Sequence, residues 1–523
     1  MKKFITIMLL FIITINGQTI RESLQKKFSN IVIDKINEIQ FAKTKEGKSI
    51  SQIQSSIDQN ILPIDSDFRV MLKIRVDQVN DSIKDFLIKE GCEIKNYNNY
   101  DMFTWVPFNK LEVIAENDKV LAIIGKGLTR TNSIISEGVA LHQGDNSSDY
   151  FHADGGGVKV GVISDGMNYS NDSYYAYELP VINSVDNSGN NELYPQSEGT
   201  AMMEIIYDFA PAAELYFGGI DNYDNYLDFA NRINHLAQQG CKVIVDDIGF
   251  IAGYSYFQEM ELSAAINQFT NNYNGCYIAA VGNDNGNMYT GTNYTIDETE
   301  FLEFNNSTTH LEFTPENSGQ VTIVLQWADT WYNPTQDFDL YVHNNTTNAV
   351  IASGLNRGSY FNPEEVCTIN VTENQKYYLR VKWYNYSISE DNREIKILFL
   401  PDESIQELNL PLKSNSKEIF GKEITNNLIG VAATNANNGS TVESFSSRGP
   451  AVVFTSGGNI ILEQQPKITG ADGVSTYVGE EGNFNNPFYG TSAAAPHIAG
   501  IAAQYFSKYP NNSSNDFLTS LSA

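Results

Sequence analysis

Between residues 155 and 300, short apolar runs alternate with amphipathic segments. GVKVGVISDG and CKVIVDDIG are continuous apolar runs of the length typical of buried strands. SEGTAMMEIIYDF and YLDFANRINHLAQQG instead have apolar residues at helical spacing. Strands that alternate with helices in this way predict a parallel sheet with helices on both faces.

The pattern changes between Phe301 and Pro401, where only strands are predicted. QVTIVLQWAD, DFDLYVHN and KYYLRVKWYN are among several short runs separated by turns that contain Asn or Gly. Short strands at this spacing are typical of a β-sandwich. Because the strand–helix pattern returns at NNLIGVAATNA, we expect an inserted sandwich at 301–401 inside one α/β domain that spans 150–300 and 402–523.

The N-terminal part has two patterns of its own. Residues 1–17 comprise two lysines, an apolar run of 12 residues and a final glycine, which are features of a secretory signal peptide. That run is shorter than the roughly 20 residues that span a bilayer. Within the N-terminal region 18–130, the segment 68–129 has the order strand, helix, strand, strand, helix, strand, which predicts a ferredoxin-like α+β unit. We therefore expect a secreted, cell-surface or periplasmic protein without a membrane span.

Composition narrows the classes of partner. Of the 523 residues, 34 are Lys or Arg and 63 are Asp or Glu, which gives a net charge of −29 at pH 7. Such a charge repels phosphate, so no nucleic-acid partner is expected. The 41% of apolar residues exclude wholesale disorder. Four cysteines are too few for a disulfide scaffold, although Cys241 and Cys276 follow glycines before apolar runs and are open both to a disulfide and to two buried free thiols.

Ser492 is the candidate nucleophile. It follows a Gly-Thr pair and precedes an Ala-rich helix in FYGTSAAAPHIAGIAAQYF, so backbone N–H groups and the positive end of a helix dipole lie beside its hydroxyl. A serine at this position is also a common helix N-cap. Asp165 and Asn283 each end a predicted strand, and parallel strands end at the edge where such folds bind ligands. An Asn amide aimed at an oxyanion stabilises it by about 3 kcal/mol.

Together and in this order, these windows resemble the subtilisin-like serine peptidases. The shared features are the Asp strand, the Gly-Asn loop, the FSSRGP segment and the specific motif Gly-Thr-Ser-x-Ala-x-Pro-His. The resemblance implies a serine endopeptidase that cleaves proteins or peptides, with Asp165 as triad aspartate, Asn283 as oxyanion asparagine and Ser492 as nucleophile. It also implies that the N-terminal region is a propeptide-like domain and a partner of the catalytic domain. The insert resembles the pre-peptidase C-terminal domain of secreted bacterial peptidases.

One departure from the family decides the chemistry. The family opens a helix with His-Gly-Thr, and this chain has Glu198 followed by Gly-Thr. His497 lies five residues after Ser492, where the family has a histidine that is not the base. The base position is therefore occupied by a carboxylate, whose ordinary pKa near 4.3 makes it a weaker proton acceptor at neutral pH than histidine at about 6.5.

Two functions remain open from the sequence. One is a Ser-Glu-Asp endopeptidase that works at acidic pH, and the other is a catalytically inactive subtilase-fold protein that binds peptides or surfaces. The sedolisins share this fold and use Glu as base, but their Asp four residues later is Met202 here, so that match fails. Asp165 would then be the second carboxylate. Asp247 is either a third member of the cluster or an ordinary strand-end acid.

If Asp165, Glu198 and Asp247 converge, they share a proton, because three ionised carboxylates repel one another strongly. We therefore predict that cleavage has its optimum below about pH 6.

The remaining expectations concern ligands and maturation. The expected serine-peptidase mechanism requires no cofactor. A structural calcium ion is an open alternative, and the sequence assigns no site to it. Asp329, Asp337 and Asp339 are close enough in sequence to suggest a calcium loop, although surface acids at a turn give the same pattern. The maturation cut is expected between Thr129 and Asp154.

Overall fold

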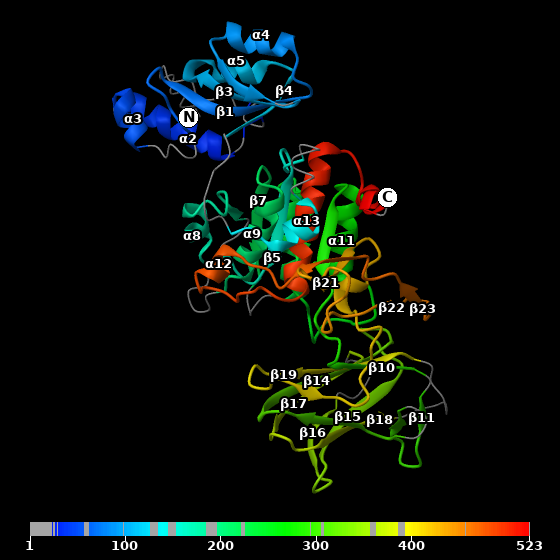
Figure 1. The fold of residues 1–523 in the computed structure, drawn as a ribbon. Coiled ribbons are helices and arrows are strands. Elements are labelled where there is room, and N and C mark those ends of the chain that lie inside the picture. Colours follow the sequence, from blue (N-terminus) through cyan, green and yellow to red (C-terminus); the bar gives the residue numbers. More distant parts are fainter. Residues whose placement is uncertain are drawn as a thin grey trace, which may run out of the picture. The chain divides into compact units, whose positions relative to one another are not determined.

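The structure is a computed structural model, shown in Figure 1, and it forms two units, residues 1–132 and 133–523. The residues described are 24, 27–28, 30–45, 47–56, 62–97, 99–125, 134–144, 153–184, 196–220, 225–292, 294–304, 308–355, 362–384, 393–455 and 457–521. The predicted signal peptide at 1–17 lies outside them.

The first unit contains a four-stranded antiparallel sheet in the order β2-β3-β1-β4. Its central strand β1 alternates buried and half-buried residues, because one face is covered by helices. Helix α4 begins where the Asn80 side chain accepts a hydrogen bond from the Ile83 N–H. The elements are α2 (Asn30–Thr44), α3 (Ile50–Ser56), β1 (Arg69–Val76), α4 (Asp81–Lys89), β2 (Glu93–Tyr97), β3 (Asp101–Pro107), η1 (Phe108–Lys110), α5 (Leu111–Glu116) and β4 (Val120–Gly125).

The second unit is built on a seven-stranded sheet in the order β24-β21-β9-β8-β5-β7-β6. All of its neighbouring strands run parallel, which confirms the predicted mixed α/β fold with a parallel sheet. The strands are β5 (Lys159–Ser164), β6 (Asn183–Ser184), β7 (Glu214–Gly219), β8 (Val243–Asp246), β9 (Cys276–Ala280), β21 (Ile429–Asn435) and β24 (Ile468–Asp472).

Two apolar cores lie on opposite faces of this sheet. Val162 of β5 packs in one core with α9 and α13, while the next residue, Ile163, packs in the other with α10 and α11. The helices of this unit are α6 (Glu137–Leu141), α8 (Ser170–Tyr175), α9 (Glu198–Phe209), α10 (Tyr226–Gln238), α11 (Glu261–Asn272), η2 (Gly421–Ile424), α12 (Tyr477–Glu480), α13 (Thr491–Lys508) and α14 (Ser514–Leu521).

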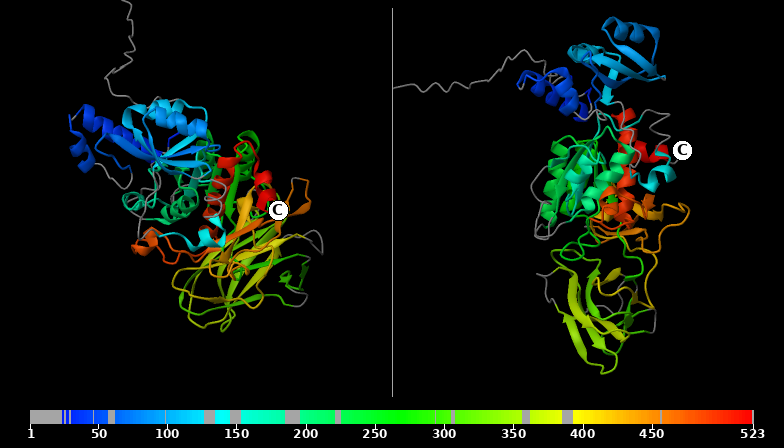
Figure 2. Two further views of the ribbon diagram at one scale, coloured as in Figure 1. Left: turned by 45° about the horizontal axis from the view of Figure 1, so that its top comes forward. Right: turned by 60° about the vertical axis from the view of Figure 1, so that its left-hand side comes forward.

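An all-β segment interrupts the α/β pattern. Its two antiparallel sheets have the orders β10-β19-β14-β17 and β16-β15-β18-β13-β20, and they share a core that contains Trp327, Phe338 and Trp383. In Figure 2 these strands, green to yellow, form a body distinct from the helices around the parallel sheet. The strands are β10 (Met288–Gly291), β13 (Leu311–Pro315), β14 (Gly319–Trp327), β15 (Asp337–Asn344), β16 (Val350–Gly354), β17 (Glu364–Val371), β18 (Tyr377–Tyr384), β19 (Ile395–Pro401) and β20 (Leu408–Asn409), with a separate pair, β11 (Thr295–Ile296) and β12 (Leu302–Glu303).

The boundaries of the all-β segment differ from the predicted 301–401. β10 begins at Met288 and pairs with β19, and β20 lies at Leu408–Asn409 and pairs with β13. Both strands are short and lie next to polar residues, so their sequence pattern is that of a loop. Elsewhere in the unit, β22 (Ala451–Phe454) and β23 (Ile460–Glu463) form a two-stranded sheet.

The structure also bears on the state of the cysteines and on the expected absence of a membrane span. The four cysteines are free and buried, so Cys241 and Cys276 are thiols rather than a disulfide. Among the residues described, no helix has both the length and the apolar character required to cross a membrane.

The helix that carries Ser492 lies directly against the sheet at a glycine. A Cβ atom placed on Gly470 of β24 would lie 2.1 Å from the carbonyl oxygen of Ala494 in α13. Because that neighbour is backbone, it cannot rotate away, and the helix would have to shift.

We therefore expect Gly470→Ala to lower the free energy of unfolding of the second unit by about 1–3 kcal/mol, through overpacking. Chemical denaturation followed by near-UV circular dichroism measures this. Gly457→Ala is the matched control, because its Cβ would meet no atom closer than 3.5 Å, and it should unfold like the unsubstituted protein. Equal midpoints for the two variants would contradict the close approach of α13.

Candidate active site

The candidate residues come from five separate points in the second unit. Asp165 follows β5 and Asp247 follows β8, while Asn283 lies three residues beyond the end of β9. Glu198 is the first residue of α9, and Ser492 is the second residue of α13. Because β5, β8 and β9 are adjacent parallel strands, their carboxyl ends lie along the same edge of the sheet.

The first turn of α9 is fixed against the loop that follows Asp165. The Thr200 hydroxyl donates a hydrogen bond to the Asn168 carbonyl at 2.7 Å, and the Ser197 hydroxyl donates to the Asn483 carbonyl at 2.8 Å. Gly199 lies so close that an added Cβ would be 2.5 Å from the Gly166 carbonyl oxygen. Glu198 therefore begins its helix in a set position.

Asp165 is held by the same turn. Burial, reinforced by the negative charge of Glu198, raises the pKa of Asp165 to about 6, and the nearby backbone N–H groups of Gly199, Gly166 and Glu198 oppose that increase. Asp165 consequently keeps its proton at mildly acidic pH and loses it near pH 6.

Asp247 lies in the same electrostatic environment. Burial raises its pKa well above the ordinary value, and the charges of Glu198 and Asp165 add to the increase. The preceding residue, Asp246, is fully buried and has its own cation, because Lys422 Nζ lies 2.8 Å from its Oδ1. Lys422 thus compensates the charge of Asp246. Asp247 instead lies near two other acids, Glu198 and Asp165.

Glu198 interacts with the nucleophile and with Asp247. Burial raises the pKa of Glu198, and polar interactions with the Ser492 and Asp247 side chains oppose that increase. An interaction that lowers the pKa favours the ionised carboxylate. The arrangement therefore fits a protonated Asp247 beside an ionised Glu198.

Asn283 is oriented by the residue before the nucleophile. Its Oδ1 accepts hydrogen bonds from the backbone N–H and the hydroxyl of Thr491, both at 3.0 Å. The amide Nδ2 remains as a donor and would lie 3.1 Å from a Cβ on Gly490, which adopts a positive φ of 105°. The Ser492 N–H belongs to the first turn of α13, where helix N–H groups have no partner within the helix. These two donors can receive an oxyanion formed at Ser492.

His497 of α13 and His142, which follows α6, make structural contacts and do not act as a base. His497 Nδ1 donates to the Ala493 carbonyl, and its Nε2 accepts from the Ser136 hydroxyl, each at 2.7 Å. Burial lowers the pKa of His497 to about 3 and that of His142 to about 4, so both rings are neutral. Their nitrogen atoms are engaged, since His142 Nε2 accepts from the Ala471 N–H at 3.0 Å. Neither residue substitutes for the missing base.

Met202, at the position where sedolisins have an acid, is completely buried in the core between α9 and the sheet. The roles of two supporting residues, Thr491 and Lys422, were missed from the sequence. Thr491, which orients Asn283, was recognised in the sequence only as part of the Gly-Thr-Ser motif. Its position next to the candidate nucleophile Ser492 was the signal that could have identified it. Lys422 lies on η2, far away in the sequence, and no local pattern linked it to Asp246.

The subtilase family model matches residues 388–521. This segment contains Ser492 and the whole of α13, and the match supports the subtilase family and a serine-type peptidase acting on proteins or peptides. No curated protein matches the chain.

Solved structures similar to the chain include three proteases. A psychrophilic protease has 16% identity, with 70% of this chain and 82% of that chain covered and a TM-score of 0.34. A cold-adapted subtilisin-like serine proteinase has 13% identity, coverage of 70% and 81%, and a TM-score of 0.33. An epidermin leader peptide processing serine protease from Staphylococcus aureus has 11% identity, coverage of 84% and 89%, and a TM-score of 0.30.

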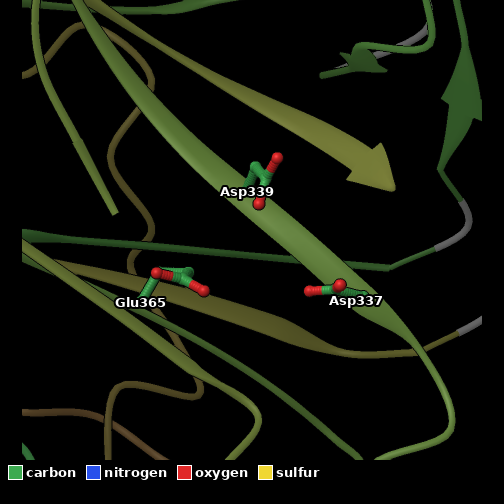
Figure 3. Close-up of side chains that lie close together, drawn as sticks. All are labelled: Asp337, Asp339 and Glu365. Atoms are coloured by element: carbon green, nitrogen blue, oxygen red, sulfur yellow. The ribbon is translucent and has the colours of Figure 1, made fainter. Parts of the chain in front are cut away.

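One group of acidic residues in the sandwich could hold a cation. Figure 3 shows Asp337 and Asp339 of β15 near Glu365 of β17, and one carboxylate oxygen from each lies within 4.8 Å of the others. Oxygen ligands of this kind suit a hard cation such as Ca²⁺. Asp329, which the sequence grouped with the two aspartates, does not belong to this group. It accepts hydrogen bonds from the Thr335 and Gln336 N–H groups at 2.7 and 2.9 Å.

The raised pKa of Asp165 predicts a pH-dependent effect of Asp165→Asn. Between its ordinary value of 3.8 and about 6, the folded protein holds a proton that the unfolded chain releases, so this carboxyl group costs stability as the pH rises. We expect the difference in unfolding free energy, variant minus wild type, to increase by about 2 kcal/mol from pH 4 to pH 7.

Chemical denaturation at both pH values measures this difference. Asp172→Asn is the control, because Asp172 is an exposed acid in α8. An Asp165→Asn difference that does not change with pH would mean that the carboxyl group is not held protonated.

Proposed function

We propose that the chain is a secreted, subtilisin-like serine endopeptidase in which Glu198 replaces the histidine base. The observation that carries this proposal is the proximity of the Ser492 and Asp247 side chains to the Glu198 carboxyl group, whose pKa both of them lower. A nucleophile, a base in contact with it and a prepared oxyanion donor are the minimum set for acyl transfer, and Asn283 supplies the third part.

In the proposed reaction, Ser492 Oγ attacks the carbonyl carbon of the scissile peptide bond, and its proton passes to the Glu198 carboxylate. The negative charge moves to the carbonyl oxygen, where Asn283 Nδ2 and the Ser492 N–H stabilise it. Glu198 then gives the proton to the leaving nitrogen as the C–N bond breaks, which leaves an acyl-enzyme. A water molecule then attacks the acyl-enzyme in the same way, with Glu198 as base, and releases the carboxylic acid product and free Ser492.

The other two carboxyl groups set the charge of this site. With protons on Asp165 and Asp247, the three acids carry a single negative charge, and that charge resides on Glu198. Asp247 lies beside it and lowers the pKa of Glu198, and Asp165 borders the turn from which Glu198 projects. No cofactor takes part in the reaction as proposed.

The N-terminal region is proposed to act as a propeptide-like partner that maturation removes. Part of the segment predicted to contain the cut is bound within the second unit. The Ser136 hydroxyl contacts His497, and Glu137 accepts hydrogen bonds from the Ser475 N–H and hydroxyl. Cleavage between Thr129 and Ser136 preserves these contacts, so we favour that part of the predicted 129–154 interval.

A serine-directed peptidyl phosphonate tests the proposed base. We expect it to label Ser492 at pH 5, and we expect Glu198→Gln to slow labelling by about 10²–10⁴-fold, because an amide cannot accept the proton. Intact-mass spectrometry follows the reaction, and Ser492→Ala is the control for the site of labelling.

Unchanged labelling in Glu198→Gln would exclude Glu198 as base. No labelling of the wild type, with or without prior acid incubation to complete maturation, would favour the alternative function of a catalytically inactive module that binds peptides.

The pH profile of peptide cleavage provides a second test. Activity should fall at low pH as Glu198 becomes protonated, and it should also fall as the pH rises through about 6, because ionised Asp165 adds a negative charge beside the developing oxyanion. We therefore expect an optimum below pH 6, and Asp165→Asn should move the alkaline limb to higher pH. A profile that is flat or rising between pH 6 and 9 would contradict the shared-proton model.

A further inference from the structure

The loop that carries Asn283 leads directly into the inserted sandwich. β9 ends at Ala280, and the first sandwich strand, β10, begins at Met288. The Phe399 N–H of β19 donates to the Asn287 carbonyl at 2.9 Å, and the Ser414 N–H donates to the Met288 carbonyl at 2.9 Å. The end of this loop is therefore part of the sandwich sheet.

The middle of the same loop is fixed by Asp284. Its carboxyl group lies beneath Gly282, where an added Cβ would be 2.6 Å from Oδ2. The Ser447 hydroxyl donates to this oxygen at 3.4 Å and accepts from the Asp284 N–H at 3.1 Å. The Ser447 N–H donates in turn to the Gly282 carbonyl at 3.0 Å. Both neighbours of Asn283 thus contact Ser447.

A buried cation from the sandwich lies next to this arrangement. Lys396 of β19 pairs with Thr290 of β10, is fully buried, and donates from Nζ to the Ile419 carbonyl. Glu418, next to Ile419, accepts from the Arg448 N–H at 2.8 Å, and Arg448 follows Ser447. Burial lowers the pKa of Lys396 to about 7, and the charges of Glu394, Glu418 and Asp284 oppose this decrease.

The sandwich also holds the loop that follows Asp247. Gln326 of β14 is almost completely buried. Its Oε1 accepts from the Tyr256 N–H at 2.8 Å, and its Nε2 donates to the Tyr254 carbonyl at 3.0 Å. Glu364 of β17 accepts from the Gly253 N–H at 2.9 Å. These bonds fix the backbone of residues 253–256 to two neighbouring strands of the same sheet.

An apolar core continues this contact. It combines residues of β10, β14 and β19 with residues of the loop after β8, the residue before η2 and β22, and Tyr256 packs on Phe420 with ring centroids 4.2 Å apart. Its buried members are Tyr256, Phe257, Met288, Val324, Ala328, Leu398, Phe420 and Val452. A contact that combines an apolar core with buried hydrogen bonds is fixed, unlike that of a domain on a flexible linker.

We propose that the inserted sandwich is a structural part of the active site, and that its β14–β19 face holds the loop of Asn283 and the loop beyond Asp247 in their working positions. Lys396 and Gln326 are then positioning residues, since neither contacts the reacting atoms. The kinetic consequence rests on the proposed function, whereas the ordering of the two loops does not depend on catalysis.

Lys396→Met and Gln326→Leu test the proposal with two readouts. The first is kcat and KM for a peptide substrate in the full chain at pH 5. The second is amide hydrogen exchange in the peptides that cover 251–258 and 281–287, measured with Ser492→Ala in the background. Val342→Ala is the matched control, because Val342 is fully buried in β15 of the opposite sheet and belongs to the core inside the sandwich rather than to the core shared with the loop after β8.

We expect Lys396→Met to lower kcat at least tenfold with little change in KM, because a displaced Asn283 weakens binding of the transition state only. Exchange in 281–287 should become faster, and Lys396→Arg should restore both quantities in part. Gln326→Leu should speed exchange in 251–258. Val342→Ala should leave kcat and exchange in both loops as in the wild type, although it lowers stability.

Equal kcat and equal loop exchange in Lys396→Met, Gln326→Leu and the wild type would overturn the proposal. The same loss of kcat in Val342→Ala would also overturn it, because the effect would then follow stability rather than loop position. If the wild type has no peptidase activity, the exchange data still decide whether the sandwich orders the loops, so failure of the proposed function remains distinguishable.

Discussion

The repulsion between carboxylates at one edge of the sheet is the constraint on which the remaining features of the site depend. Asp165, Glu198 and Asp247 come from three separate elements. Burial raises the pKa values of Asp165 and Asp247; the charge of Glu198 adds to the increase at both, and the charge of Asp165 adds to it at Asp247. One negative charge is the most that the group can carry without repulsion between its members. The buried Lys422 keeps Asp246 from adding a further uncompensated charge at the end of β8.

Much of this arrangement could be predicted from the sequence, because it follows from strand periodicity. The apolar runs identified the ends of β5 and β8, and these adjacent parallel strands bring their carboxyl ends together. That Asp247 belongs beside Asp165 was proposed from the resemblance to the subtilisin-like peptidases. Periodicity contains no information on contacts between distant segments. The bonds of Asn283 with Thr491 and of Asp246 with Lys422 therefore came only from the structure.

In the inserted sandwich, too, the strand pattern does not reveal contacts with distant segments. Its strands alternate apolar and polar residues, a pattern that predicts one solvated face. Gln326 and Lys396 fit that reading in the sequence, yet both are buried, because the loop that follows β8 and the segment around Ile419 cover this face. A polar residue in a predicted strand is compatible both with contact to water and with contact to a polar loop, so the sequence alone does not identify a covered face.

A carboxylate base also changes what the surrounding site must do. When a neutral histidine takes the proton of serine, a cation and an oxyanion are created together, and an ionised aspartate stabilises the cation. When Glu198 takes it, its own charge disappears as the oxyanion forms, so a single negative charge moves from Glu198 to the substrate oxygen. An ionised Asp165 then has no cation to stabilise and repels the oxyanion. The stability of the transition state consequently depends more on the donors of Asn283 and Ser492, and the position of the Asn283 loop gains importance with this base.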